Sequence, residues 1–379
     1  MRFAFTEEQE ALRSSARSFL NDHSASAQVR AAMQTETGYD PALWQRIGAE
    51  LGWTAILIPE TYGGLGLGYV ELVALMEEMG AALLCAPFFS TVCLATNVLL
   101  IGGHEEHKQR YLRAIASGDA TATLAMTEPN GRWDAAGIET VAARSDSGFV
   151  LNGTKTFVVD GHTADLLIVA ARSPGSHGAD GIWLFAVPAE TPGIERRLLP
   201  TMDQTRKQAE ITLREVCLPA AAQLSNAADG WAVLSKTLDL AAIALAAEQL
   251  GGAQRCLDLT VEYAKQRVQF GRPIGSFQAI KHKCADMLLR VESARSASYY
   301  AGWAASVHDP ELPALASLAK AYCSDAYFQC AAEAIQIHGG VGFTWEYDVH
   351  LYFKRAKSSE TLLGDATYHR ELVAQRIGL

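Results

Sequence analysis

Residues 267–278, RVQFGRPIGSFQ, place two arginines around a glycine-containing turn that lies between two long helical patterns. Gly271 and Gly275 let the backbone turn without a Cβ clash, and Pro273 fixes one φ angle between them. Arginine side chains beside exposed backbone N–H groups can share the oxygens of a diphosphate. On these residues alone, an ordinary turn with solvated arginines is the more common explanation, so a diphosphate site needs a second match.

A second glycine turn ends a helical pattern in residues 333–342, EAIQIHGGVG. The two segments read R-x-x-F-G-R-P-[IL]-x-x-F-Q and Q-x-H-G-G-x-G, an arrangement that closely resembles the acyl-CoA dehydrogenase family. In that family the first segment reaches the FAD of a neighbouring subunit, and the second lies along the adenosine half of the same cofactor. The resemblance implies FAD as the cofactor and assigns six contacts to these segments, namely Arg267, Phe270, Gln278, Gln336, Gly339 and Gly340.

The middle of the chain supplies a third match, to the residues that hold the flavin ring in this family. Met126 and Thr127 begin a segment that resembles T-E-P, where the threonine hydroxyl and nearby backbone N–H groups hold the polar edge of the flavin. Residues 152–161, NGTKTFVVDG, resemble N-G-x-K-x-[WFY]-I-[TS]-N-G, which implies that Phe157 covers the flavin. Val159 then occupies the position where a threonine or serine usually donates to flavin N5, so that atom loses a polar neighbour.

The family removes the α-proton of an acyl thioester with a carboxylate while hydride passes from Cβ to flavin N5. Such a base is buried beside the ligand, where desolvation raises its pKa, and hydrogen-bond donors stabilise the enolate-like charge. Two positions hold this glutamate in different family members, and here they hold Leu363 and Ala241. A serine that usually faces the acyl-CoA is also missing or displaced, since residues 130–134 read NGRWD. The resemblance is therefore to a divergent type that lacks the usual catalytic glutamates.

Three nearby acids are candidates for the missing base, and none of them fits well. Glu248 lies on about the same helical face as Ala241, but two turns, roughly 10 Å, along the axis. Asp239 points away from that face, and Glu360 is one loop turn from Leu363. A salt bridge or an interface explains Glu248 better than catalysis does, so the catalytic residue stays unassigned.

Three functions are compatible with these residues. The first is an FAD-dependent acyl-CoA dehydrogenase with an unusually placed base, which forms the 2-enoyl-CoA and passes electrons to an electron-transfer flavoprotein. The alternative is a non-catalytic subunit of a heteromeric enzyme for bulky substrates, such as steroid side-chain acyl-CoAs, that completes the FAD site. A third, nitroalkane or N-hydroxylation chemistry on the same fold, has no positive support. The resemblance implies a homodimer, a homotetramer or a heterotetramer with a homologous subunit.

Residues 241–253 are rich in alanine and glycine, which bears on the substrate. If this helix lines the acyl pocket, as it does in the family, its small side chains leave room for a bulky or branched acyl group. Close packing between helices requires the same small residues and explains them equally well.

The composition is that of a globular protein with sizeable cores, since the 379 residues are 49% hydrophobic and 20% charged. A net charge of -10 argues against nucleic acid as a main partner. The seven cysteines form no CxxC pair and are odd in number, which favours reduced thiols in a cytoplasmic protein. The first residues lead into a charged run, and no stretch approaches the uninterrupted apolar length of a membrane span. We therefore expect no secretory signal and no membrane partner.

Two segments resemble known motifs but depart from them in spacing. Residues 54–68, TAILIPETYGGLGLG, do not have the glycine spacing of a dinucleotide-binding turn, and a tight loop between helices is expected there. His104 and His107 are three positions apart, whereas the metal-binding HExxH motif separates its histidines by four. A solvated first helical turn explains the histidines better, and we expect no metal site.

Changes of pattern divide the chain into three predicted domains of an α+β fold. Residues 1–119 and 226–379 have helical periodicity, whereas residues 120–225 contain about seven short β-rich runs and a hairpin signal at Asp146-Ser147-Gly148. In the last domain, helices are expected at 227–266, 277–308, 310–338, 345–358 and 366–376. A helical domain, a middle β-barrel and a C-terminal four-helix bundle follow one another in this order in the acyl-CoA dehydrogenase fold.

Overall fold

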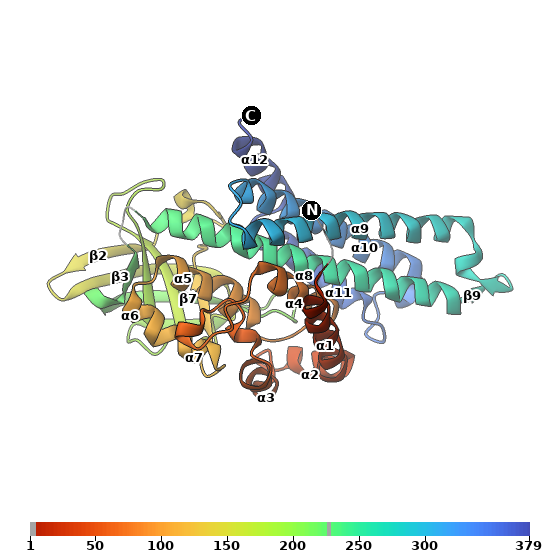
Figure 1. Cartoon of the computed structure of the whole chain (residues 1–379), viewed down its shortest axis with the longest axis horizontal. Coiled ribbons are helices and arrows are strands. Elements are labelled where there is room, and N and C mark those ends of the chain that lie inside the picture. The colour runs from red at the N-terminus through yellow and green to blue at the C-terminus, as the bar shows by residue number, and fades with distance from the viewer. Residues whose placement is uncertain (1–4, 226–228) are drawn as a thin grey trace. The chain divides into compact units, whose positions relative to one another are not determined.

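Helices form both ends of the chain and a sheet forms its middle, as Figure 1 shows for the computed structural model. The structure describes residues 5–225 and 229–379. The predicted helix start at residue 227, the domain border beside residue 226 and the leading residues 1–3 lie outside these. In space the chain divides into two units, each described here by itself. Of the described residues, the bundle unit comprises 5–31, 68–84 and 242–379, and the sheet unit comprises 32–67, 85–225 and 229–241.

The bundle unit is built from long helices that lie close to their predicted positions. Its C-terminal part contains α9 (Gln278–Ser306), α10 (Leu312–His338), α11 (Val349–Thr361), α12 (Ala366–Arg376) and the larger part of α8 (Gly230–Gln266). α10 packs against α9, α11 and α12. Two helices from the N-terminal region, α1 (Glu7–His23) and α4 (Tyr69–Ala81), and the first part of α2 (Ser26–Gln34) also belong to this unit.

Small residues on α8 allow other elements of the bundle unit to come into contact with it. A Cβ on Gly251 would overlap the backbone oxygen of Glu77 on α4, and a Cβ on Gly252 would overlap the ring of Tyr327 on α10. The sequence left two explanations for these small residues, close helix packing and a roomy acyl pocket. At Gly251 and Gly252, close packing is the explanation.

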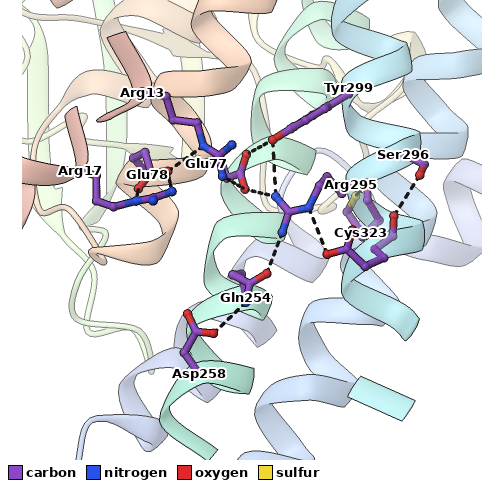
Figure 2. A network of polar contacts seen from close by, with 12 residues as sticks. Arg13, Arg17, Glu77, Glu78, Gln254, Asp258, Arg295, Ser296, Tyr299 and Cys323 are labelled. Carbon is purple, nitrogen blue, oxygen red and sulfur yellow. Dashed lines mark hydrogen bonds and ion pairs between the residues drawn. The ribbon is translucent and has the colours of Figure 1, made fainter. Parts of the chain in front are cut away.

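A buried ionic network joins α1, α4 and α9 (Figure 2). The Glu77 carboxylate accepts hydrogen bonds from the Tyr299 hydroxyl at 2.6 Å, from Arg13 at 3.5 Å and from Arg295. The neighbouring Glu78 accepts from Arg13 at 3.1 Å and from Arg17 at 2.7 Å. Both carboxylates are buried and Arg17 is about half exposed, so the network holds α1 against α4 through two buried anions whose cations reach toward the surface.

The N-terminal elements of the sheet unit are short. Asp40 caps α3 (Pro41–Gln45) by accepting a hydrogen bond from Ala42 N at 2.9 Å. Residues 54–68 form the expected tight loop, because a Cβ on Gly64 would overlap the backbone of Ile58. The remaining helices here are α5 (Asn97–Gly102), α6 (Glu105–His107) and α7 (Arg113–Ala116), and part of α2 (Ser26–Gln34) also belongs to this unit.

The sheet has eight strands in the order β6-β7-β3-β2-β4-β5-β8, with β1 beside β4. The strands are β1 (Ala122–Ala125), β2 (Val141–Ser145), β3 (Gly148–Val159), β4 (Leu166–Arg172), β5 (Ile182–Pro188), β6 (Ile194–Leu198), β7 (Gln208–Pro219) and β8 (Gln223–Ser225). The predicted hairpin is confirmed, since Ser145 pairs with Gly148 across a two-residue turn. Seven strands match predicted β-rich runs, and the three-residue β8 was missed because it is too short to show a pattern.

One helix, α8, departs from the expectation that no stretch reaches the apolar length of a membrane span. Among the described residues it alone is long and apolar enough to pass a test of length and composition, with a mean hydropathy of 1.4 in its most apolar window. Within that window 72% of the residues are buried inside the protein, as in the core helix of a globular protein. The test by itself is weak evidence for a membrane span.

Candidate cofactor site

The turn at residues 267–278 projects from the end of α8 and has a defined conformation. Two short strands, β9 (Val268–Gln269) and β10 (Arg272–Pro273), pair in it, and Ile274 N donates to Arg267 O at 2.8 Å. Phe270 has a φ of 55° and is 92% exposed at the tip. A left-handed backbone at a non-glycine residue is strained. Arg267 and Gln278 are also exposed.

The second glycine turn lies beside the first. α10 ends at His338, whose ring stacks on Tyr263 with centroids 4.2 Å apart, and Tyr263 O accepts from Arg267 N at 2.8 Å. A Cβ at Gly339 or Gly340 would meet no atom within 4 Å, so the backbone of this turn is open to a ligand. The structure thus brings the two predicted segments to one end of the bundle unit (Figure 1), with Gln336 exposed on the last turn of α10.

In the sheet unit, the residues assigned to the flavin ring have different surroundings. Phe157 is 49% exposed and has a φ of 54°, in an irregular part of β3 where the register against β7 shifts. Such a bulge re-aims a side chain outward. The Thr127 hydroxyl donates to Thr156 O at 2.7 Å. Met126 and Val159 are buried, so their side chains face the protein interior.

A buried ion pair that the sequence analysis missed supports this part of the sheet unit. Lys155 Nζ lies 2.6 Å from Glu128 Oε1 and donates to Met126 O at 3.1 Å. The same Glu128 oxygen accepts from Thr140 N at 2.8 Å. Burial lowers the pKa of Lys155 to about 8, while the charge of Glu128 opposes that shift. The pair holds the Met126-Thr127-Glu128 segment against β3.

The loop that carries Leu363 is fixed by buried polar groups of α10 and α12. Lys320 Nζ donates to Glu360 O at 3.2 Å, to Gly364 O at 3.1 Å and to Ser324 Oγ at 2.8 Å. His369 Nε2 lies 3.0 Å from Leu363 O, and burial lowers the pKa of His369 to about 3, so its imidazole is neutral. Its Nε2 therefore carries the proton that Leu363 O accepts.

Leu363 itself is buried and has a φ of 64°, another left-handed backbone at a non-glycine residue. Its N–H has no hydrogen-bond acceptor among the residues that the structure describes. A buried unpaired N–H is uncommon in folded proteins. The loop therefore offers a backbone donor for a carbonyl oxygen, although the side chain at this position is apolar.

The two positions that hold the catalytic glutamate in the family carry no carboxylate, and the nearby acids are engaged elsewhere. Ala241 is fully buried, as is the aliphatic stretch around it. Glu248 Oε1 lies 3.1 Å from Arg355 Nη1, and both side chains are buried. Glu360 pairs with Lys357 at 2.9 Å on the surface. The buried ion pair confirms the salt-bridged role that the sequence favoured for Glu248.

No group of three or more histidine, cysteine, aspartate or glutamate side chains able to hold a metal ion exists within residues 5–225 and 229–379. His107 Nε2 lies 2.7 Å from Ala221 O, so this ring has a structural partner. The seven cysteines are free, and five of them are buried.

Replacing Lys320 with methionine is expected to destabilise the protein, and more strongly at pH 9 than at pH 7. Burial lowers the pKa of Lys320 to about 7, far below its ordinary value. The amino group of Lys320 therefore binds its proton more tightly in the unfolded chain than in the folded protein. The contribution of Lys320 to stability consequently rises as pH increases from about 7 toward 10.5, and methionine has no such dependence. Denaturant unfolding at both pH values measures the difference. Lys281→Met, at an exposed site on α9, is the control and should show no change of this kind.

Comparison with known proteins gives matches along almost the whole chain. Models of the N-terminal, middle and C-terminal domains of acyl-CoA dehydrogenases match residues 6–119, 123–216 and 228–378. The acyl-CoA dehydrogenase IpdE2 of Mycolicibacterium smegmatis is 36% identical over 359 residues, which are 95% of each chain.

Solved structures agree with this result. The ChsE4–ChsE5 complex from Mycobacterium tuberculosis matches with a TM-score of 0.90 and 29% identity, covering 100% of this chain and 99% of that one. The structure of PigA with FAD and proline matches with a TM-score of 0.93 and 26% identity, covering 100% of both chains. From the domain models, the relatives and the three-part fold together, this chain belongs to the acyl-CoA dehydrogenase family, whose members are oxidoreductase flavoproteins.

Proposed function

We propose that this chain completes the FAD site of a heteromeric acyl-CoA dehydrogenase and does not itself supply the catalytic base. The observation that carries the proposal is the contrast between the two glycine turns, at one end of the bundle unit, and the loop at Leu363. The two turns proposed to contact FAD are ordered and open, whereas Leu363 and Ala241 occupy both positions that hold the base in the family and Glu248 is held by Arg355. A chain that has the cofactor turns but no catalytic base fits an assembly in which this subunit completes the FAD site and a homologous subunit supplies the base.

The residues present fit a dinucleotide at the two turns. Arg267 and the backbone around Gly339 and Gly340 suit a diphosphate, and the exposed ring of Phe270 offers an apolar surface to the adenosine half. In the sheet unit, Phe157 suits stacking on the flavin ring. FAD, when bound, accepts the hydride that leaves Cβ of the acyl group.

A second candidate, a dehydrogenase that works alone, is favoured by one observation. The Leu363 N–H is unpaired and its loop is fixed by Lys320 and His369, so a thioester carbonyl could be polarised there. That candidate still requires a base to remove the α-proton. The ion pair of Glu248 with Arg355 opposes its use for this purpose, because removing Glu248 from the pair would leave a buried charge without a partner.

The partners and the substrate are part of the same proposal. ChsE4 and ChsE5 form a complex of two different chains, which supports a heterotetramer with a homologous subunit over a homo-oligomer. Steroid side-chain acyl-CoAs are the bulky substrates proposed for such an assembly. An electron-transfer flavoprotein is the proposed electron acceptor, and the cytoplasm is the proposed location.

The absorption spectrum of the protein, produced alone and with a homologous subunit that carries a catalytic glutamate, tests the proposal. We expect a colourless or weakly yellow protein alone, and a yellow complex whose flavin is bleached by acyl-CoA. Glu248→Gln should leave this bleaching, measured per folded complex, within about threefold of the unaltered complex, since Glu248 is not the base. Bleaching by the isolated protein that Glu248→Gln abolishes would instead establish the second candidate.

A further inference from the structure

A cavity of about 400 Å³ lies in the bundle unit and is lined by none of the residues assigned to the cofactor. Its walls come from α1, the start of α2, the end of α4 and parts of α8 and α11. The floor is apolar and buried, and consists of Leu20, Val29, Leu83 and Leu351. The lining as a whole mixes polar and apolar surface, and the cavity volume lies within the range of about 300–1,000 Å³ that is typical of small-molecule sites.

Most charges around this cavity are already neutralised within the bundle unit. Arg17 forms a two-point pair with Glu78, with distances of 2.9 Å and 2.7 Å, and Figure 2 shows the two side chains facing one another. Asp348 pairs with Arg30 at 2.6 Å. These four groups leave little net charge for a ligand to meet.

Arg255 is a charged residue of the cavity that is not neutralised by an ion pair within the part of the chain that the structure describes. Arg255 lines the cavity together with Tyr352, whose hydroxyl donates to Ala81 O at 2.6 Å. Among the described residues, no carboxylate lies within ion-pair distance of Arg255. Asp258, one turn further along α8, also lines the cavity and accepts from Gln254 at 2.8 Å (Figure 2). One guanidinium is therefore available to an anion from outside, at a rim that also carries one acidic group.

The floor contains a strained residue as well. Leu83 follows the end of α4 with a φ of 49°, a left-handed backbone that costs a non-glycine residue free energy. Glycine is the usual residue at such a helix end. The leucine side chain is nonetheless present and buried, facing the cavity. The Leu83 side chain thereby adds apolar surface to the floor.

We propose that this cavity binds a small carboxylic acid with an apolar chain of medium length. The carboxylate pairs with Arg255, whose planar fork matches its two oxygens, and the chain lies on the floor around Leu20 and Leu83. Asp258 favours a single negative charge over the double charge of a phosphate monoester, because it repels the second charge more strongly. This site is independent of the proposed function, since it shares no residue with the cofactor turns.

Titration of the full-length protein with octanoate, with octyl phosphate and with 1-octanol, followed by calorimetry, tests the site. We expect saturable binding of octanoate, weaker binding of octyl phosphate and binding of 1-octanol at least about fivefold weaker than octanoate. Arg255→Gln should weaken octanoate about fivefold, and Asp258→Asn should tighten it about twofold, since the two charges act in opposite directions. Arg113→Gln, an exposed arginine of the sheet unit, is the matched control and should change nothing.

A larger side chain at the floor or the rim would block this cavity, and so it distinguishes octanoate bound here from octanoate bound at another site that accepts an acyl chain. Val29→Trp fills the floor and Ala25→Phe narrows the exposed rim, so that one variant remains informative if the other fails to fold. Either should abolish octanoate binding. The proposal is overturned if the protein shows no saturable octanoate binding up to about 10 mM. It is equally overturned if Arg255→Gln and Arg113→Gln behave alike, or if folded Val29→Trp and Ala25→Phe bind normally.

Discussion

Replacing Arg267 with alanine is expected to lower the affinity of the assembled protein for FAD about 10- to 100-fold. A hydrogen bond to a charged group contributes about 1.5–3 kcal/mol, and each 1.4 kcal/mol changes an affinity tenfold. Arg267 is exposed at the turn and its backbone is fixed by bonds to Tyr263 and Ile274, so its loss should leave the fold intact. Flavin fluorescence released during dialysis of the complex measures retention.

Lys265→Ala is the matched control for this experiment. Lys265 is exposed near the end of α8, two positions before Arg267, and its loss removes the same charge from the same region. Its effect should be at most about threefold, because a solvated charge near a ligand contributes little when it makes no direct contact. Equal retention by the two variants would show that Arg267 does not touch the cofactor, which would remove the main support for the proposed function.

Replacing Glu77 with alanine is expected to lower the free energy of unfolding by about 3–5 kcal/mol. Its carboxylate accepts from Arg13, Arg295 and Tyr299 and is buried between α1, α4 and α9. Removing it leaves the partly buried guanidinium of Arg295 without its closest anion. Burial, together with the charge of Glu77, also raises the pKa of the Tyr299 hydroxyl, which fits a site with little access to water. Chemical denaturation of the full-length protein measures the change.

Glu10→Ala provides the comparison for Glu77→Ala. Glu10 is an exposed carboxylate that lies 3.6 Å from the same arginine, Arg13. Exposed pairs contribute about 0.2–1 kcal/mol, so this variant should unfold almost as the unaltered protein does. A similar cost for both variants would mean that burial does not strengthen the network, and that α1 is held to α4 by apolar contacts alone.

Local sequence patterns predicted most helices and strands of this fold, because turns and helix ends are determined by residues that are close in the sequence. The hairpin at residues 145–148 and the cap at Asp40 follow from turn and capping chemistry within a few residues. Sequence patterns predicted helical periodicity across residues 1–119, but they did not show that the helical segments at 46–50, 89–96 and 108–112 have hydrogen bonds that depart from the regular α-helical spacing. They also missed β8, which has only three residues.

The buried polar groups of the site could not be predicted in the same way. Lys155 stands in a β-rich run as a single charge, and its partner Glu128 comes from a different strand end, 27 positions earlier. Lys320 meets the loop at Gly364, which is 44 positions further on. A sequence pattern reports the face on which a side chain lies, but not which distant group meets it there. The useful signal was the residue type, since lysine in an otherwise apolar run requires a partner.

The Tyr263–His338 stack has a consequence for how the proposed enzyme would respond to dilution. It ties the two turns to one rigid end of the bundle unit, so neither turn can adjust alone to a cofactor seated in another chain. Under the proposed function, cofactor retention and subunit association would then be one equilibrium, governed by mass action. Lowering the protein concentration would release flavin and subunits together, and added FAD would in turn drive the chains to associate.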